Sequence, residues 1–279
     1  MADRKMRRFP RALRRALLLI PTLVALAFFA AAGWLLLTQS GLERAAALAA
    51  WASEDAVRID GARGRLVGPL AFDRVDVAAG ADRYTLHDVT IEWEFLELLH
   101  GRLDIQRLRI GRLELALAES AVSTPPADLR LPLAVRVAAL EIGIIAAHDD
   151  PAPLAEDIAA TLESDGATHR LAALTLKSAA GRLTAQGSLA GVAPFALAAE
   201  LNLATDPGLV IAGEPALAIA ARADGMLAEI AVAFDGRGAD FSLAGQARLA
   251  PFAAQPLVAL RLTGQREIRA APVEGDGHI

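Results

Sequence analysis

Hydrophobic side chains follow two different patterns along this chain. Residues 16–37 read ALLLIPTLVALAFFAAAGWLLL, a run of 22 positions without a charge in which Thr22 is the only polar side chain. From Val57 onward apolar and polar residues alternate instead, as in Leu113-Glu-Leu115-Ala-Leu117. The first pattern predicts a transmembrane helix, and the second predicts strands with one apolar and one polar face.

The apolar run is long enough to cross a membrane and has a clear orientation. A helix of this length spans roughly 33 Å. Residues 1–15 carry seven lysine and arginine residues against one acid, Asp3. Because short basic flanks stay in the cytoplasm, we interpret residues 1–15 as a cytoplasmic arm, 16–37 as a signal anchor and the remainder as lying outside.

A cleaved signal peptide is the alternative interpretation of this run. Ala30-Ala31-Ala32 would then supply the small residues of a cleavage site. The run is longer than a usual signal core, however, and Trp34 and three leucines continue beyond that site. These features favour an uncleaved anchor. Residues 38–53 are alanine-rich and predict a short linker helix, and residues 54–279 form the main domain.

Turn residues punctuate the alternating region every ten residues or so. Asp60-Gly61, Asp224-Gly225 and Asp235-Gly236 are examples. The spacing predicts a long antiparallel meander of about fifteen short strands, one of which opens at Leu131-Pro-Leu133. The segment from Ile91 begins as a strand and ends in one helical turn before Gly101.

A faint internal repeat supports an extended arrangement. Leu183–Leu189 contains Gly187 and is followed by Pro194-Phe195, and Phe241–Leu249 contains Gly245 and is followed by Pro251-Phe252. The two glycines are 58 positions apart, a spacing of about four strands. Repeats at such spacing indicate a one-dimensional stack rather than a closed globule.

Composition favours an open apolar surface over a filled core. Hydrophobic residues make up 54% of the chain but aromatic residues only 5%, which is too few large side chains for a compact sandwich. We therefore expect an all-β domain in which a long curved antiparallel sheet forms an open groove. The residues expected to line its concave face are Val75, Val77, Ile91, Trp93, Leu103, Ile105, Leu133, Val135, Ile142 and Ile144.

Charge and chemistry-bearing residues exclude several functions. The net charge is −5, so the chain beyond the basic arm carries −11, and such a surface does not suit nucleic acid. There is no cysteine, no G-x-S-x-G, no H-E-x-x-H and no Walker loop. His148-Asp149-Asp150 is the most site-like cluster, but it lies beside two prolines in an expected turn. We predict no catalytic residue, no metal site and no cofactor, and hence no enzyme.

Several motifs together carry a resemblance to a known family. Residues 60–72 read DGARGRLVGPLAF, and they are followed by Ile91-Glu-Trp93, by residues 98–105 reading LLHGRLDI, and by Leu108-Arg-Ile110. Over residues 1–145 this order and spacing resembles the N-terminal region of the TamB family, the inner-membrane subunit of the translocation and assembly module, within the AsmA-like group.

The resemblance implies a location and a set of partners. Family members are anchored in the inner membrane of diderm bacteria and hold a periplasmic β-groove with an apolar interior. They are linked to outer-membrane protein assembly with the partner TamA, and to phospholipid transport between the membranes. They are usually several times longer than this chain and end in a C-terminal domain that meets the outer-membrane partner. The expected partners are therefore the inner membrane, phospholipid acyl chains, and either an outer-membrane TamA-like protein or a separate C-terminal TamB segment.

Two functional hypotheses follow. In the first, the groove holds or conducts phospholipid, which requires a continuous apolar strip without charge. In the second, the protein is a periplasmic scaffold or chaperone that offers a sheet edge to outer-membrane β-barrel strands, without lipid transport. The regular apolar face favours the first.

Overall fold

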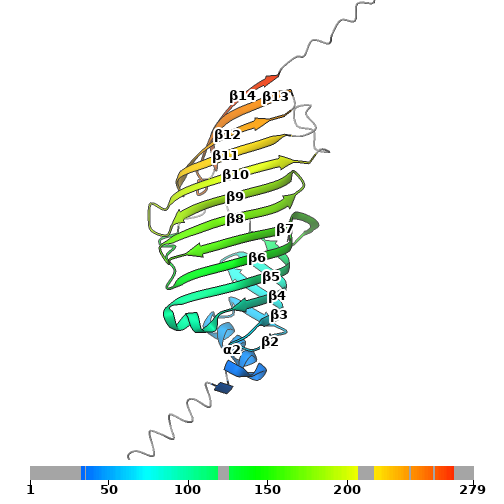
Figure 1. Ribbon diagram of the computed structural model, residues 1–279, viewed down its shortest axis with the longest axis vertical. Coiled ribbons are helices and arrows are strands. Elements are labelled where there is room, and N and C mark those ends of the chain that lie inside the picture. Colours follow the sequence, from blue (N-terminus) through cyan, green and yellow to red (C-terminus); the bar gives the residue numbers. More distant parts are fainter. Residues whose placement is uncertain are drawn as a thin grey trace, which may run out of the picture.

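A single open sheet dominates the computed structural model, which describes residues 33–34, 36–118, 126–206, 217–238, 240–253 and 255–266. Its fourteen strands follow one another across the sheet in chain order from β1 to β14, except that β2 pairs beside β3 (Figure 1). Over these residues the sheet does not close, because β1 and β14 end the order. The expected all-β open sheet is confirmed.

The strands lengthen and then shorten along the sheet. The N-terminal strands are β1 (Val57–Asp60), β2 (Arg63–Gly64), β3 (Leu70–Ala79), β4 (Asp82–Trp93), β5 (Arg102–Ala116), β6 (Ala134–Ala147) and β7 (Asp150–Ser164). The C-terminal strands are β8 (Thr168–Ser178), β9 (Gly181–Ala190), β10 (Ala196–Thr205), β11 (Ala218–Met226), β12 (Glu229–Arg237), β13 (Phe241–Leu249) and β14 (Leu257–Arg266).

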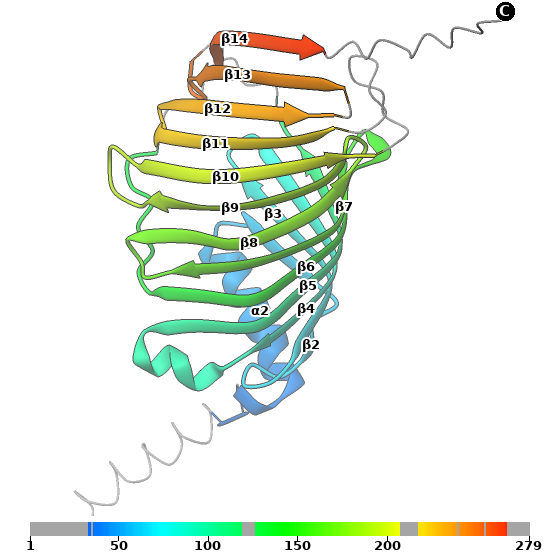
Figure 2. The same cartoon turned by 45° about the horizontal axis from the view of Figure 1, so that its top comes forward.

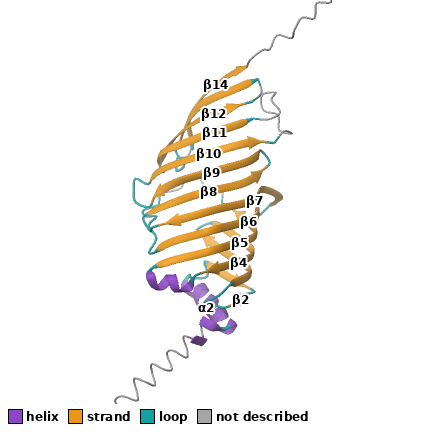
Figure 3. Cartoon of the chain, in the orientation of Figure 1, coloured by secondary structure: helices purple, strands orange, loops and turns teal. Residues whose placement is uncertain are grey.

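Helical structure gathers at the N-terminal end of the sheet (Figure 3). Helix α2 (Gln39–Ala52) begins after Thr38, whose Oγ1 accepts a hydrogen bond from the Gly41 amide at 3.1 Å, as a helix-capping side chain does. The 3₁₀ helix η1 (Phe95–His100) follows β4 and ends at Gly101, where φ is 72°. This is the helical turn that the sequence predicts.

The expected transmembrane segment, residues 16–37, lies almost wholly outside the described residues. Within the part of the chain that is described, no helix combines the length and the hydrophobicity that a membrane crossing needs.

One pair of neighbouring strands departs from the expected antiparallel meander. Strands β5 and β6 are parallel, so the chain must return to the starting end of β5 before β6 begins, which takes a long connection. Residues 131–133, which the sequence predicts as strand, belong to this connection instead. The Leu131 amide donates a hydrogen bond to the Gly166 carbonyl at 2.9 Å, and Pro132 has no amide hydrogen to donate.

A line of kinks crosses five strands and changes which residues share a face. The register passes from Ile110↔Ile142 to Arg112↔Ile144, and each strand from β3 to β7 skips one residue at this level. The skipped residues are Asp73, Asp88, Gly111, Gly143 and Asp157. Because each of the five strands skips one residue, neighbouring strands keep their pairing. Beyond the skipped residue, however, the side chains that face inward are one position later in each sequence than strict alternation predicts.

The hydrophobic core lies between α2 and one face of the early strands. Leu42 of α2 is 2% exposed and belongs to one cluster with buried residues of β3 to β7. Five of these form a single cross-strand row: Phe72, Val89, Ile110, Ile142 and Ile158. We call this side of the sheet the inner face. Figure 2 shows the sheet curving so that β3 and β4 turn behind the later strands.

Candidate functional site: the apolar inner face

Three cross-strand rows of uncharged residues run along the inner face. In an antiparallel or parallel ladder, directly paired residues lie on the same side of the sheet, so the register defines each row. The longest row crosses from β3 to β14 and contains no polar side chain. Its members are Leu70, Ile91, Leu108, Leu140, Ala160, Leu174, Ala185, Leu201, Ala221, Phe234, Gly245 and Leu262.

The second and third rows lie side by side on one flank of the first and begin on β4 and β5, respectively. The second contains Trp93, Ile105, Val137, Leu162, Leu171, Gly187, Ala199, Ala223, Val232, Ala247 and Leu260. The third contains Leu103, Val135, Ser164, His169, Leu189, Leu197, Gly225, Ile230, Leu249 and Leu257. No row carries an acidic residue, a lysine or an arginine, and only Ser164 and His169 add polar groups.

The structure brings most of the sequence-predicted site residues to this face. Those placed there are Val75, Val77, Ile91, Trp93, Leu103, Ile105, Val135 and Ile142. One expectation is wrong: Ile144 lies in a row with Arg112 and Glu156 on the opposite face. The skipped Gly143 is the reason, because it shifts the alternation between Ile142 and Ile144. Leu133 precedes β6, in the connection from β5, and belongs to no paired row.

The inner face is covered at one end and open at the other. In the cluster that includes Leu42 of α2, Val89 is 3% exposed. From β9 to β13 the inner-face side chains are mostly half-buried, and Leu262 on β14 is 59% exposed. A contiguous apolar surface of this kind is rare on soluble proteins unless something binds it.

Trp93 combines apolar packing with an unused polar group. Its ring meets that of Phe95 edge to face, with ring centroids 5.6 Å apart. The indole Nε1–H is buried and donates no hydrogen bond within the described residues. A buried donor without an acceptor is uncommon in native proteins.

The opposite face, which we call the outer face, carries charged side chains. Along one row, successive strands β5 to β8 present Asp104, Arg136, Glu163 and Arg170, an alternation of charge. The Asp104 carboxylate lies 3.6 Å from the Arg136 guanidinium. Farther along, hydrogen bonds from Arg222 and Gln186 lower the pKa of Glu200 below its ordinary value. Charged side chains thus lie on this face and are absent from the three inner rows.

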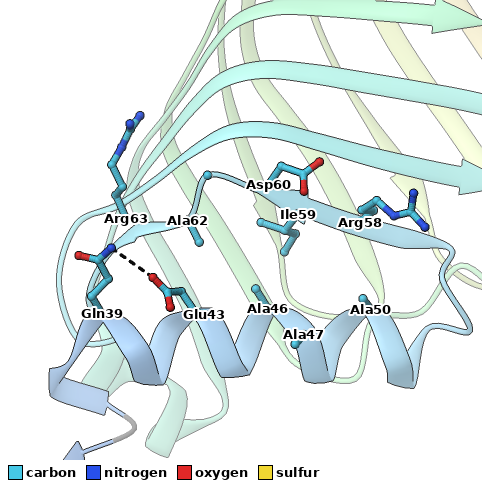
Figure 4. A pocket seen from close by; sticks show the side chains of 11 residues that line it. Gln39, Glu43, Ala46, Ala47, Ala50, Arg58, Ile59, Asp60, Ala62 and Arg63 are labelled. Carbon is cyan, nitrogen blue, oxygen red and sulfur yellow. Dashed lines mark hydrogen bonds between the residues drawn. The ribbon is translucent and has the colours of Figure 1, made fainter.

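A cleft of about 500 Å³ separates α2 from β1 (Figure 4). Ala46 and Ala50 of the helix face Ile59 of β1, while Gln39 Nε2 donates to Glu43 Oε1 at 3.2 Å. Small alanines allow the helix to approach the strand closely. The polar side chains are spread around the rim and do not converge, so we regard this cleft as the seam by which the helix covers the end of the sheet.

Two of the histidines considered from sequence approach one carboxylate, that of Glu114. His87 Nε2 and His148 Nδ1 lie 3.9 Å and 3.7 Å from the oxygens of Glu114, which is also bound by Arg112 at 3.0 Å. His148, Asp149 and Asp150 sit exposed where β6 turns into β7. Over the described ranges of the chain, no group of three or more His, Cys, Asp or Glu side chains is placed to hold a metal ion.

The inner face is therefore the candidate site. The sequence-predicted residues on this face all belong to β3 to β6, and the register extends the face to β14. No protein-family model matches this chain, and no curated protein or solved structure is significantly similar to it.

Proposed function

We propose that this protein is an inner-membrane-anchored periplasmic protein that carries phospholipid acyl chains along the inner face of its sheet, in the manner expected of a TamB-like protein. One observation carries the proposal: three parallel rows of uncharged side chains continue through ten or more strands and remain partly open to solvent.

The energetics of the inner face suit acyl chains. Each methylene group that leaves water for an apolar surface contributes about 0.8 kcal/mol. Any charge on that surface would oppose the transfer by several kcal/mol, and the three rows contain none. Neighbouring strands lie about 4.8 Å apart, so the twelve strands from β3 to β14 offer a path of roughly 50 Å.

The two ends of the path differ in how far they are covered. Helix α2, which follows the expected anchor, covers the inner face at the β3 end. The β14 end is open. In this proposal, lipid occupies the open part of the face beyond α2 and leaves at the β14 end. A path of this length calls for a further component, either an outer-membrane TamA-like protein or a separate C-terminal TamB segment.

Site-specific photo-crosslinking tests the proposal in the full-length protein in its native membrane. A crosslinking residue at Val232 lies on the inner face, and one at the neighbouring Ala233 lies on the outer face of the same strand. We expect phospholipid adducts, read by mass spectrometry, at Val232 and far fewer at Ala233. Equal labelling at both positions would reject lipid carriage. Protein adducts alone at Val232 would reject it and favour the scaffold hypothesis.

A further inference from the structure

We propose that the free edge of β14 is a docking edge for an antiparallel strand of a second protein, which continues the sheet and both of its faces. The strand that fits resembles β11: small apolar residues toward the inner face, and an acidic residue opposite Arg261. This inference concerns backbone pairing at the edge and does not depend on what the inner face carries.

The two edge strands of the sheet differ in length, charge and coverage. Strand β1 has four residues, places Arg58 and Asp60 at alternate positions, and lies against α2. Strand β14 has ten residues and no proline, and its inner-face positions hold Leu260, Leu262 and Gly264. Natural edge strands are usually kept short, charged or covered, because free backbone groups attract other strands. Strand β1 is short, charged and covered, whereas β14 shows only the outward Arg261 and one irregularity in register where it begins.

Both apolar and backbone surfaces continue up to this edge. Leu260 is 55% exposed although it ends one of the inner-face rows. Edge strands that are protected from pairing commonly carry a charged side chain at such a position. The apolar face thus reaches β14 without a change to charged side chains.

The internal repeat indicates which strand is missing. Its two copies form equivalent hairpins, β9–β10 and β13–β14, each with a Pro-Phe pair in the turn. The hairpins differ in register, so the repeat is one of strand order and turn position. In the first copy the far side of β10 pairs with β11 over nine residues. In the second copy the corresponding side of β14 has no partner among the described residues.

Charge specifies the incoming strand further. On the outer face, acids meet arginines on neighbouring strands: Glu229 lies 3.3 Å from Arg248, and Glu200 pairs with Arg222. Arg261 of β14 is exposed and forms no ion pair within the described residues. Opposite charges on directly paired residues stabilise a ladder and like charges oppose it. An acid opposite Arg261 therefore continues the pattern.

A designed peptide tests the edge on the full-length protein in detergent. The probe is a fluorescently labelled copy of residues 217–226 with Ala220→Glu, since Ala220 pairs with Asn202, the position on β10 that corresponds to Arg261. The control peptide carries Ala220→Lys. We expect fluorescence anisotropy to show the glutamate peptide binding about tenfold more tightly than the lysine peptide.

Variants of the protein assign the binding to β14. Leu260→Lys and Leu262→Lys each place an inward charge on the edge and should abolish binding, with circular dichroism confirming that strand content is kept. Leu96→Lys, at an exposed position of η1, should bind as the unaltered protein does. Binding that survives both edge variants overturns the proposal. So does a dimer, seen by sedimentation, that Leu260→Lys dissociates, because a second copy would then occupy the edge.

Discussion

The imidazole Nε2 of His169 lies 2.9 Å from the carbonyl oxygen of Leu129, forty positions earlier in the chain. Its Nδ1 lies 2.9 Å from Ser164 Oγ. His169 sits on the inner face of β8, and Leu129 belongs to the connection that makes β5 and β6 parallel. The Leu129 amide in turn donates to the Gly191 carbonyl at 2.9 Å. The only two polar side chains of the three inner rows thus fasten this connection to the ends of β7 to β9.

His169→Ala should loosen the connection. The change removes two hydrogen bonds at a half-buried site, each worth about 1 kcal/mol, and leaves the Leu129 carbonyl without its side-chain donor. We expect faster hydrogen exchange at the Leu129 and Leu131 amides, measured by mass spectrometry on the full-length protein. His148→Ala, in the exposed turn after β6, is the matched control and should leave those amides unchanged. Unchanged exchange in His169→Ala would contradict this role.

A charge on the inner face should expel lipid without unfolding the sheet. Leu201 and Asn202 are neighbours on β10 that face opposite sides. Leu201→Asp places a carboxylate among apolar side chains, where binding acyl chains would cost several kcal/mol. We expect the phospholipid that copurifies with the protein to fall severalfold, with the circular dichroism spectrum retained. Asn202→Asp should copurify with the normal amount. Equal lipid in both variants would argue against carriage on this face.

Gly143→Ala should destabilise the line of kinks. A Cβ atom at this position would lie 2.6 Å from the Gly111 carbonyl oxygen, closer than van der Waals contact allows. Because the clash is with backbone, relief requires strands β5 and β6 to separate. We expect a loss of about 2 kcal/mol or more in the free energy of unfolding, measured by urea denaturation. Gly68→Ala meets only the Arg65 carbonyl oxygen, at 3.9 Å, and should change stability little.

Acid should weaken the outer face through Asp76. Hydrogen bonds from Arg74 and Thr85 lower the pKa of this carboxyl below its ordinary value of 3.8. A carboxyl whose pKa is depressed in the folded state stabilises the protein above its unfolded pKa, and this contribution is lost as pH falls through the folded value. Stability should therefore decline below about pH 4, and Asp76→Asn should make the decline shallower. Asp149→Asn, in the exposed β6–β7 turn, should leave it as steep. Urea midpoints between pH 3 and pH 7 provide the comparison.

The sequence alone predicts the strands and the existence of an apolar face. A side-chain period of two, interrupted by Asp-Gly and similar turns, predicts strands, their approximate ends and an apolar face. It places Val75, Ile91 and Ile105 on the same side, as the structure does. Such inferences succeed because alternation and turn conformation depend on residues within a few positions of one another.

Nonlocal pairing decided the rest. The parallel neighbours β5 and β6 depend on hydrogen bonds from Leu129 and Leu131 to residues far along the chain. Ile144 faces outward because one residue is skipped in each of five neighbouring strands. The sequence of a single strand does not show this. Likewise, the chain's alternation establishes that an apolar face exists, whereas only the register joins its residues into unbroken rows. Register is set by contacts between strands, and these form only when the whole sheet is assembled.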